Sequence, residues 1–375
     1  MLLIEVVAGS SQRISQNTDE PSRLRVFTST VLMPAHDEAE GISEAINAVR
    51  AQLQTNDRIL VVADNCTDET ANVARGLGAE VVERDNPGQR GKGYALDFGV
   101  RWLEKSPPNV TIIIDADCVV QPGSLARLAN ACVESGRPVQ AQYLMHSPLG
   151  SGLSTRIAEF AWRIKNKLRP AGSLALGWPC QLMGTGMAFP WAIIQQAPLA
   201  TGHLVEDMQL GLDLAIAGTP PLFCPQALVT SSFPTATAGV KSQRMRWEHG
   251  HLSVLCTVGP PMIWRAMKTR NRSLLAMALD LMVPPLAALV LILVALMSVN
   301  AGFWLFTANA GPLVLSLIAI AFVVISVAVA WAREGRQIVS TSEMLSVPWY
   351  VVAKIPVYIS LFTKRQIEWV RTKRD

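Results

Sequence analysis

Two long stretches of this chain contain no charged residue, and they constrain its fold more than any other feature. They cover residues 281–299 and 312–332. Because an α-helix rises about 1.5 Å per residue, each stretch is long enough to cross the roughly 30 Å hydrocarbon core of a bilayer. Only 17% of all residues are charged, whereas soluble domains carry roughly 25%. We therefore predict two transmembrane helices near the C-terminus, over about 274–299 and 312–332.

The charges that flank these stretches predict how such a helical hairpin is oriented. The connecting residues 300–311 contain no Lys or Arg. Basic residues precede the first stretch and follow the second, namely Arg265, Lys268, Arg270, Arg272, Arg333 and Arg336. Under the positive-inside rule the connecting loop lies outside and both flanks lie in the cytosol. We therefore expect a multi-pass protein of the bacterial inner membrane, with most of the chain in the cytosol.

The two ends of the chain predict further contact with membrane lipids. Residues 344–363 are apolar but contain Lys354 between Pro348 and Pro356. A basic tail follows, with Lys364, Arg365, Arg371, Lys373 and Arg374. A full span would carry this tail outside, so an interfacial or re-entrant helix is favoured over a third span, with the tail on anionic headgroups. Residues 1–27 read as a short packed or interfacial segment with a polar linker, or alternatively as the end of a membrane helix whose beginning is missing.

Residues 28–255 alternate between buried strands and amphipathic helices, ahead of a membrane region over 256–375. The strands are "STVLM", "RILVVAD", "AEVVER" and "VTIIID". This alternation predicts an α/β domain with a mostly parallel, Rossmann-like sheet and helices on both faces. Ligands bind such sheets outside the carboxyl ends of the strands. Polar residues follow those ends and should meet in one crevice, namely His36, Asp37, Glu38, Asp64, Asp115 and Asp117.

The charge of the chain limits its partners. The net charge is +4, and no dense Lys/Arg stripe occurs in the first 240 residues. We therefore expect no nucleic-acid partner.

Two short motifs predict binding of a phosphate and a cation. In "IIIDADC", Asp115 and Asp117 can share a divalent cation such as Mg²⁺ or Mn²⁺, because hard cations prefer oxygen ligands. In "GQRGKGYAL", Lys92 lies among glycines ahead of a helix, an arrangement that suits phosphate. Each motif has a plainer interpretation when taken alone: carboxylates are common after strands, and a glycine-rich stretch is often a flexible loop.

Two further motifs add a base and an anion-binding face. Glu206 and Asp207 precede an apolar helical pattern, where they could stabilise the helix dipole or act as a general base. Gln243, Arg246 and Trp247 share one helical face at spacings i, i+3 and i+4. Arginine binds phosphate with two donors, and tryptophan offers a stacking surface. The alternative for the second motif is a basic-aromatic belt beside the membrane.

The order of these motifs along the chain resembles that of membrane-bound glycosyltransferases of family 2. This group contains cellulose, chitin and hyaluronan synthases and ceramide glucosyltransferase, and the likeness covers about residues 28–270. The resemblance implies a GT-A-type fold and an inverting, metal-dependent transfer from a nucleotide sugar, with UDP-sugars expected, to a lipid-linked or glycan acceptor. It implies donor binding by Pro34, His36, Glu38, Asp64, Lys92, Asp115, Gln243 and Arg246. It implies acceptor binding by Gly184, Thr185, Gly186 and Trp247, metal ligation by Asp117 with Asp115, and catalysis by Asp207, the base, with Glu206.

Departures from the family pattern leave three alternatives open. "PAHDE", "ADNCTDET" and "VED" differ from the commoner forms of their motifs, and only two clear spans are present. Two spans favour transfer of a single sugar over processive synthesis, which would require an oligomer or partner subunits. A nucleotidyltransferase could use the same sheet and carboxylates. A membrane scaffold that only binds nucleotide sugars is the non-enzymatic alternative.

Overall fold

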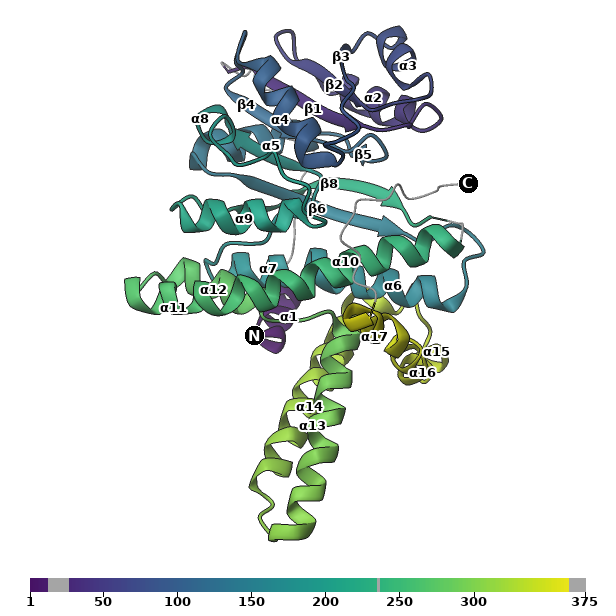
Figure 1. Ribbon diagram of the computed structural model, residues 1–375, viewed down its shortest axis with the longest axis vertical. Helices are drawn as coiled ribbons and strands as arrows, with labels where there is room; N and C mark the ends of the chain where they lie inside the picture. Colours follow the sequence, from purple (N-terminus) through teal and green to yellow (C-terminus); the bar gives the residue numbers. More distant parts are fainter. Residues whose placement is uncertain (13–26, 235–236, 364–375) are drawn as a thin grey trace.

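The chain folds into a sheet-containing domain, a layer of helices beneath it and a long projecting helical hairpin (Figure 1). This computed structural model describes residues 1–12, 27–234 and 237–363, without the side chains of 237–244 and 361–363. The basic tail and most of the N-terminal linker therefore lie outside the described residues.

One half of the sheet is parallel, as the alternating sequence predicts. Its strands lie in the order β3-β2-β1-β4, and they are β1 (Ser29–Ala35), β2 (Arg58–Asp64), β3 (Glu80–Arg84) and β4 (Val110–Ile113). They are joined by α2 (Ile42–Arg50), α3 (Thr70–Gly76) and α4 (Lys92–Leu103). In β1, Val31 and Met33 belong to one apolar core and Leu32 to another, because successive side chains of a strand point to opposite faces. Helices therefore cover both faces, as predicted.

The other half of the sheet is mixed, so the prediction of a mostly parallel sheet is right only in part. Its strands, in order from β4, are β7 (Met187–Pro190), β6 (Val139–His146), β8 (Leu222–Ser232) and β5 (Val119–Val120). β7 is antiparallel to β4 and β6, and β5 is antiparallel to β8, whereas β6 and β8 are parallel. The regular alternation ends after α5 (Ser124–Ser135), and a helical excursion then separates β6 from β7. The direction of β7 depends on that excursion, which strand patterns do not encode.

The helical layer beneath the sheet includes the N-terminal segment. Its elements are α1 (Leu2–Ser11), α6 (Leu153–Arg163), the π-helical turn η1 (Ile164–Leu168), α7 (Arg169–Ala175), α10 (Thr237–Thr257), α11 (Gly259–Thr269) and α12 (Arg272–Leu281). α1 crosses α7 so closely that a Cβ atom on Gly172 would lie 2.0 Å from the backbone oxygen of Glu5. Arg169 pairs there with both Glu5 and Asp280. These contacts join α1, α7 and α12 into one unit.

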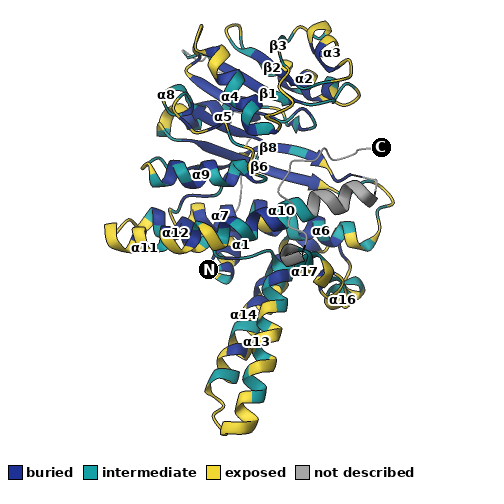
Figure 2. Cartoon of the chain, viewed as in Figure 1, coloured by how far each residue is buried: buried dark blue, intermediate teal, exposed yellow. Residues whose placement is uncertain are grey.

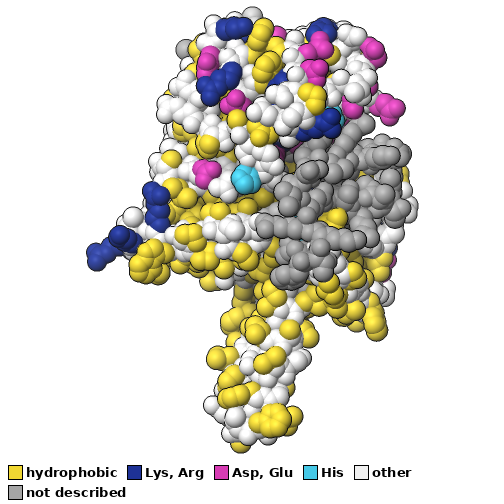
Figure 3. Space-filling view, in the orientation of Figure 1, with side chains coloured by type: hydrophobic (Ala, Val, Ile, Leu, Met, Phe, Trp, Pro, Cys, Tyr) yellow, Lys and Arg dark blue, Asp and Glu magenta, His cyan; other side chains and the backbone are white. Residues whose placement is uncertain are grey.

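Two helices of the described chain are long and apolar enough to cross a membrane. They are α13 (Leu286–Thr307) and α14 (Gly311–Ala330), and the second continues as a π-helical turn, η2 (Trp331–Gly335). Few of their residues are buried (Figure 2), and hydrophobic side chains cover the hairpin whereas charged ones gather on the sheet domain (Figure 3). The first helix begins later than predicted, because Pro284 and Pro285, which cannot donate backbone hydrogen bonds, separate it from α12.

The segment after the hairpin forms short helices. They are α15 (Thr341–Met344), α16 (Val347–Val352) and α17 (Ile355–Thr363). At about 1.5 Å per residue, none of the three alone has the length of a membrane span. An interfacial or re-entrant placement of this segment remains a prediction.

Candidate active site

Lys92 joins three parts of the chain that the sequence keeps far apart. It is the first residue of α4, directly after Gly91, whose φ of 133° few residues other than glycine adopt. Its Nζ atom forms an ion pair with Asp115 and donates a hydrogen bond of 2.7 Å to the backbone oxygen of Gly184. Burial acts to lower the pKa of Lys92, but the neighbouring carboxylates, chiefly that of Asp115, raise it above its ordinary value. The ammonium group therefore remains charged at neutral pH.

The two aspartates after β4 have ligand atoms close together. One ligand atom each of Asp115, Asp117 and Cys118 lie within 4.8 Å of one another. Burial raises the pKa of the Cys118 thiol to about 12, and this neutral thiol donates to Oδ1 of Asp117 over 3.1 Å. The backbone N–H of Asp115 donates to the hydroxyl of Thr185 over 3.1 Å. Two carboxylates are thus held beside each other, and the thiol supports one of them.

Glu206 and Asp207 form the first turn of α9 (Glu206–Ile216) and face the same region. A Cβ atom on Gly184 would lie 3.3 Å from Oδ2 of Asp207 and 3.7 Å from Nζ of Lys92. Burial, and then the charge of Asp207, raise the pKa of Glu206 to about 7. Burial also raises the pKa of Asp207, against the opposing effect of Lys92. Helix-dipole stabilisation and a role as a base are both compatible with this position.

The helix α10, in the helical layer beneath the sheet, carries Arg246 and Trp247. Burial lowers the pKa of Arg246, against the opposing charges of Glu206 and Asp207. Its Nε atom is buried without a hydrogen-bond partner among the described residues. The indole of Trp247 packs on that of Trp162, with ring centroids 4.9 Å apart. The side chain of Gln243 lies outside the described residues.

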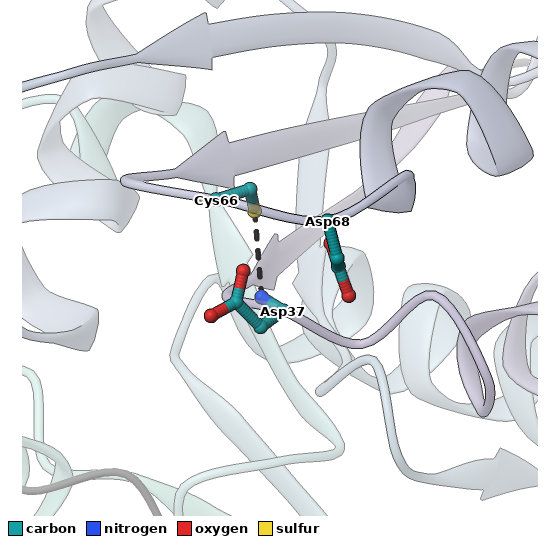
Figure 4. Close-up of side chains that lie close together, drawn as sticks. All are labelled: Asp37, Cys66 and Asp68. Atoms are coloured by element: carbon teal, nitrogen blue, oxygen red, sulfur yellow. Dashed lines mark hydrogen bonds between the residues drawn. The ribbon is translucent and has the colours of Figure 1, made fainter.

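A second group of predicted residues lies at the ends of β1 and β2. Figure 4 shows Asp37, Cys66 and Asp68 close together, with the backbone N–H of Asp37 donating to Cys66 over 3.5 Å. Nδ1 of His36 lies 2.7 Å from the backbone oxygen of Asp64. Two N–H groups of this region are also satisfied by side chains: Thr67 donates to Asp37 over 2.6 Å, and Glu38 donates to the hydroxyl of Thr70 over 2.8 Å. Pro34 lies in β1, opposite Val62.

An open cleft connects this group with the D-x-D motif. Its volume is about 850 Å³, and its lining includes Asp37, Glu38, Asp68, Asp117, His146 and Phe233. Of the six residues that the sheet topology was expected to bring into one crevice, Asp37, Glu38 and Asp117 line this cleft, whereas His36, Asp64 and Asp115 are not among its lining residues. Asp64 is buried and accepts a 2.6 Å hydrogen bond from Arg84.

The loop 183–186 supports the site more than it lines it. Thr185 is fully buried, and a Cβ atom on Gly186 would lie 2.8 Å from that of Ala141. Contact with an acceptor through the side chain of Thr185, as the family resemblance implies, is therefore prevented in this structure. Gly184 is the member of the loop that borders Lys92 and Asp207.

Several residues at the site escaped the sequence analysis, Gln140 and Lys165 among them. Gln140 of β6 is fully buried, accepts a hydrogen bond from the N–H of Met183 and donates one to the oxygen of Thr185, each 2.8 Å long. The sequence could have indicated Gln140, because a glutamine inside an otherwise apolar strand is unusual. Lys165 in η1 lies near Asp207. Desolvation lowers the pKa of Lys165, and the negative charge of Asp207 opposes this effect. A lysine within a basic segment gave no signal of this position.

Comparison with known proteins identifies relatives of the sheet domain. Residues 28–250 match a family described as glycosyltransferase like family 2. A glycosyltransferase of Mycobacterium tuberculosis is 29% identical over an alignment of 191 residues, and the match covers 44% of this chain and 82% of that protein. The low-salt glycan biosynthesis hexosyltransferase Agl6 of Haloferax volcanii is 35% identical over 111 residues, which are 29% of this chain and 25% of that protein.

A solved structure resembles nearly the whole chain. It is the mannosyltransferase PcManGT of Pyrobaculum calidifontis, in complex with GDP-Man and Mn²⁺, with a TM-score of 0.50 and 17% sequence identity. The similarity covers 89% of this chain and 100% of that one. At this level of identity the likeness concerns the fold alone.

Proposed function

Because the chain belongs to the family 2-like glycosyltransferases, we propose that it transfers one sugar, with inversion, from a nucleotide sugar to a lipid-linked or glycan acceptor at the cytosolic membrane face. The observation that carries this proposal is the meeting of Lys92, Asp115 and Asp207 around the backbone of Gly184. This arrangement combines a fixed cation, a candidate metal ligand and a candidate base, which are the groups that transfer to a hydroxyl requires.

The carboxylates after β4 fit a divalent metal ion. Asp115 and Asp117 offer oxygen ligands close together, and Mg²⁺ and Mn²⁺ prefer oxygen. Cys118 does not disturb this set, since its neutral thiol donates to Asp117. When bound, such an ion would stabilise the negative charge of the departing diphosphate. The similar mannosyltransferase was solved with Mn²⁺ and GDP-Man, which supports a metal and a nucleotide-sugar donor here.

The remaining roles are assigned to side chains that face the same region. Arg246 has a buried Nε donor without a described partner, and a diphosphate oxygen would satisfy it. In this proposal the carboxylate of Asp207 accepts the proton of the acceptor hydroxyl as the new bond to the sugar forms. The strand-end group with His36 and Glu38 would hold the nucleoside, while Trp247 would border the acceptor.

The helical hairpin supports a membrane location. α13 and α14 have the length and hydropathy of spans, and basic residues flank both ends of the hairpin but not its tip. We infer a multi-pass protein of the bacterial inner membrane, whose active site faces the cytosol. Two helices leave little room for a polymer channel within one chain, which favours single transfer over processive synthesis.

A donor screen tests this function. Purified full-length protein is incubated with UDP-, GDP- and TDP-sugars and Mn²⁺ or Mg²⁺, and nucleoside diphosphate is measured. We expect metal-dependent release with one donor, loss of release in Asp117→Ala, and normal release in Glu134→Ala, whose side chain is exposed on α5 away from the site. Release of pyrophosphate from a nucleoside triphosphate with a sugar phosphate would instead identify a nucleotidyltransferase. Binding without turnover of any donor would indicate a scaffold.

A further inference from the structure

A second pocket lies between the active site and the foot of the membrane hairpin. Its volume is about 150 Å³. Most of its wall is apolar or aromatic, with contributions from α6, α10, the start of α13 and α16, namely Ala158, Ala161, Trp162, Ile164, Phe233, Trp247, Pro284, Pro285, Leu286 and Tyr350. Its polar lining consists of Lys165, Arg169, Glu248, His251 and Lys354. The pocket thus connects a stacked pair of tryptophans near the candidate base with the helix that would enter the bilayer.

Two of the three cationic side chains in this pocket already form ion pairs with carboxylates. Lys354 forms an ion pair with Glu248. Arg169 forms ion pairs with Asp280 and with Glu5. These pairs leave little charge to attract a ligand.

Lys165 is the cation that remains. No described carboxylate lies within ion-pair distance of it, and the largest effects of neighbouring charges on its pKa come from Asp207 and Arg169. Its side chain is exposed towards the pocket, and its Nζ atom lies 5.4 Å from the ring centroid of Trp162. The residue belongs to the π-helical turn η1, and such turns often occur at functional sites. A lysine without a carboxylate at ion-pair distance, in a mostly apolar pocket, favours an anionic ligand with an apolar body.

We propose that this pocket binds a lipid phosphate, with the phosphate on Lys165 and the chain leaving past Pro285 and Leu286 at the foot of α13. This inference rests on the proposed function, in which the chain glycosylates a lipid-linked acceptor. The lipid phosphate is the part of that acceptor that the membrane holds. Trp162 and Trp247 contact the part of the acceptor that lies between its phosphate and its reacting hydroxyl. Asp207 stays available for that hydroxyl, because Lys165 balances the charge of the phosphate.

A binding experiment in the absence of any donor tests the pocket. The full-length protein in an uncharged detergent is titrated with dodecyl phosphate, dodecanol or inorganic phosphate, and tryptophan fluorescence is followed. We expect dodecyl phosphate to bind at least about tenfold more tightly than either of the others, because dodecanol lacks the charged group that Lys165 would bind and inorganic phosphate lacks the apolar chain. Inorganic phosphate binding as tightly as dodecyl phosphate would overturn the lipid part of the proposal.

Single substitutions distinguish the contribution of the Lys165 charge to binding from that of the pocket's shape. Lys165→Gln should weaken dodecyl phosphate binding by about tenfold or more, and Lys165→Arg should restore most of it. Ala161→Phe, which fills the pocket and leaves the lysine in place, should also weaken it. The matched control is Lys167→Gln, because Lys167 lies in the same turn but is paired with Glu334. Partition into micelles is common to all variants and cancels in the comparison. Equal affinity of Lys165→Gln and the unaltered protein would overturn the proposal.

The two proposals can fail separately. Absence of nucleoside diphosphate release from every donor, with dodecyl phosphate binding intact, would remove the proposed transfer and leave the lipid phosphate site. Metal-dependent donor turnover without selective binding of dodecyl phosphate would remove the lipid phosphate site alone.

Discussion

The adjacent carboxylates Glu206 and Asp207 give the active site a measurable dependence on pH. Burial raises the pKa of both groups, that of Glu206 to about 7. A base must be deprotonated to act, so activity is lost as pH falls through the raised pKa. We expect the acid limb of the kcat profile to lie above the ordinary aspartate pKa of about 3.9. The measurement is transfer at saturating donor across the pH range in which the protein stays folded.

A variant at the neighbouring position serves as the control for this prediction. Glu206→Gln removes one negative charge beside Asp207, and the acid limb should then move to lower pH. A profile that stays flat down to the ordinary aspartate range, or one that Glu206→Gln leaves in place, would contradict the assignment of the base.

At the residue scale, Lys92, Asp115 and Asp207, which the family resemblance assigns to one site, lie together, but the sequence did not indicate how the backbone holds them. Lys92, Asp115 and Asp207 converge because strand ends and helix starts lie at one edge of an α/β sheet. The support of Thr185 by Gln140 depends on the register between β6 and the loop 183–186. That register arises from tertiary contacts and leaves no mark in local residue patterns.

At the scale of elements, the crossing of α1 and α7 holds the N-terminal helix against the helix that carries Arg169. A Cβ atom on Gly172 would lie 2.0 Å from the backbone oxygen of Glu5. We predict that Gly172→Ala forces the helices apart and costs about 1 to 3 kcal/mol, the usual range for overpacking. Thermal unfolding in detergent should show a Tm lower by several degrees.

A second helical glycine provides a matched control for the crossing. A Cβ atom on Gly76 of α3 would have no neighbour within 4 Å, so Gly76→Ala should leave the Tm unchanged or raise it slightly. A Tm of Gly172→Ala equal to that of Gly76→Ala would show that α1 does not pack on α7 in solution.

The elements themselves were predictable to different degrees. The apolar residues of α2, spaced as a helix requires, are buried: Ile42, Ala45, Ile46 and Val49. By contrast, α12 was merged with the first membrane stretch in the sequence prediction, because both are apolar. Its burial against α9 and α11, beyond the reach of composition alone, separates it from that stretch.

At the scale of the whole molecule, the exposed apolar hairpin should decide where the protein resides. Leu296 of α13 and Phe322 of α14 are 50% and 52% exposed, which suits contact with lipid. We predict that replacing both by Arg abolishes carbonate-resistant membrane association, since each charge near a span centre costs about 2.5 to 3.5 kcal/mol on insertion scales. Leu149→Arg, on a fully exposed loop of the sheet domain, is the control and should stay with the membrane. Unchanged extraction of the double variant would argue against spans.

The sequence patterns of strands and helices predicted one half of the sheet and not the other. The parallel strands β1 to β4 follow from strict alternation, whereas the reversed β7 follows from a helical excursion whose path the pattern does not specify. The same excursion includes η1 with Lys165. The part of the fold that was hardest to predict is therefore the part that would meet the acceptor.

The most direct test of the central claim is a comparison of Asp207→Asn with the unaltered protein, measuring donor affinity and transfer on the same preparation. The amide keeps the shape of the side chain beside Gly184 but cannot accept the proton. Donor affinity should stay within about threefold, while kcat falls by about 10²- to 10⁴-fold, the usual contribution of a general base. Normal turnover by Asp207→Asn would contradict the account.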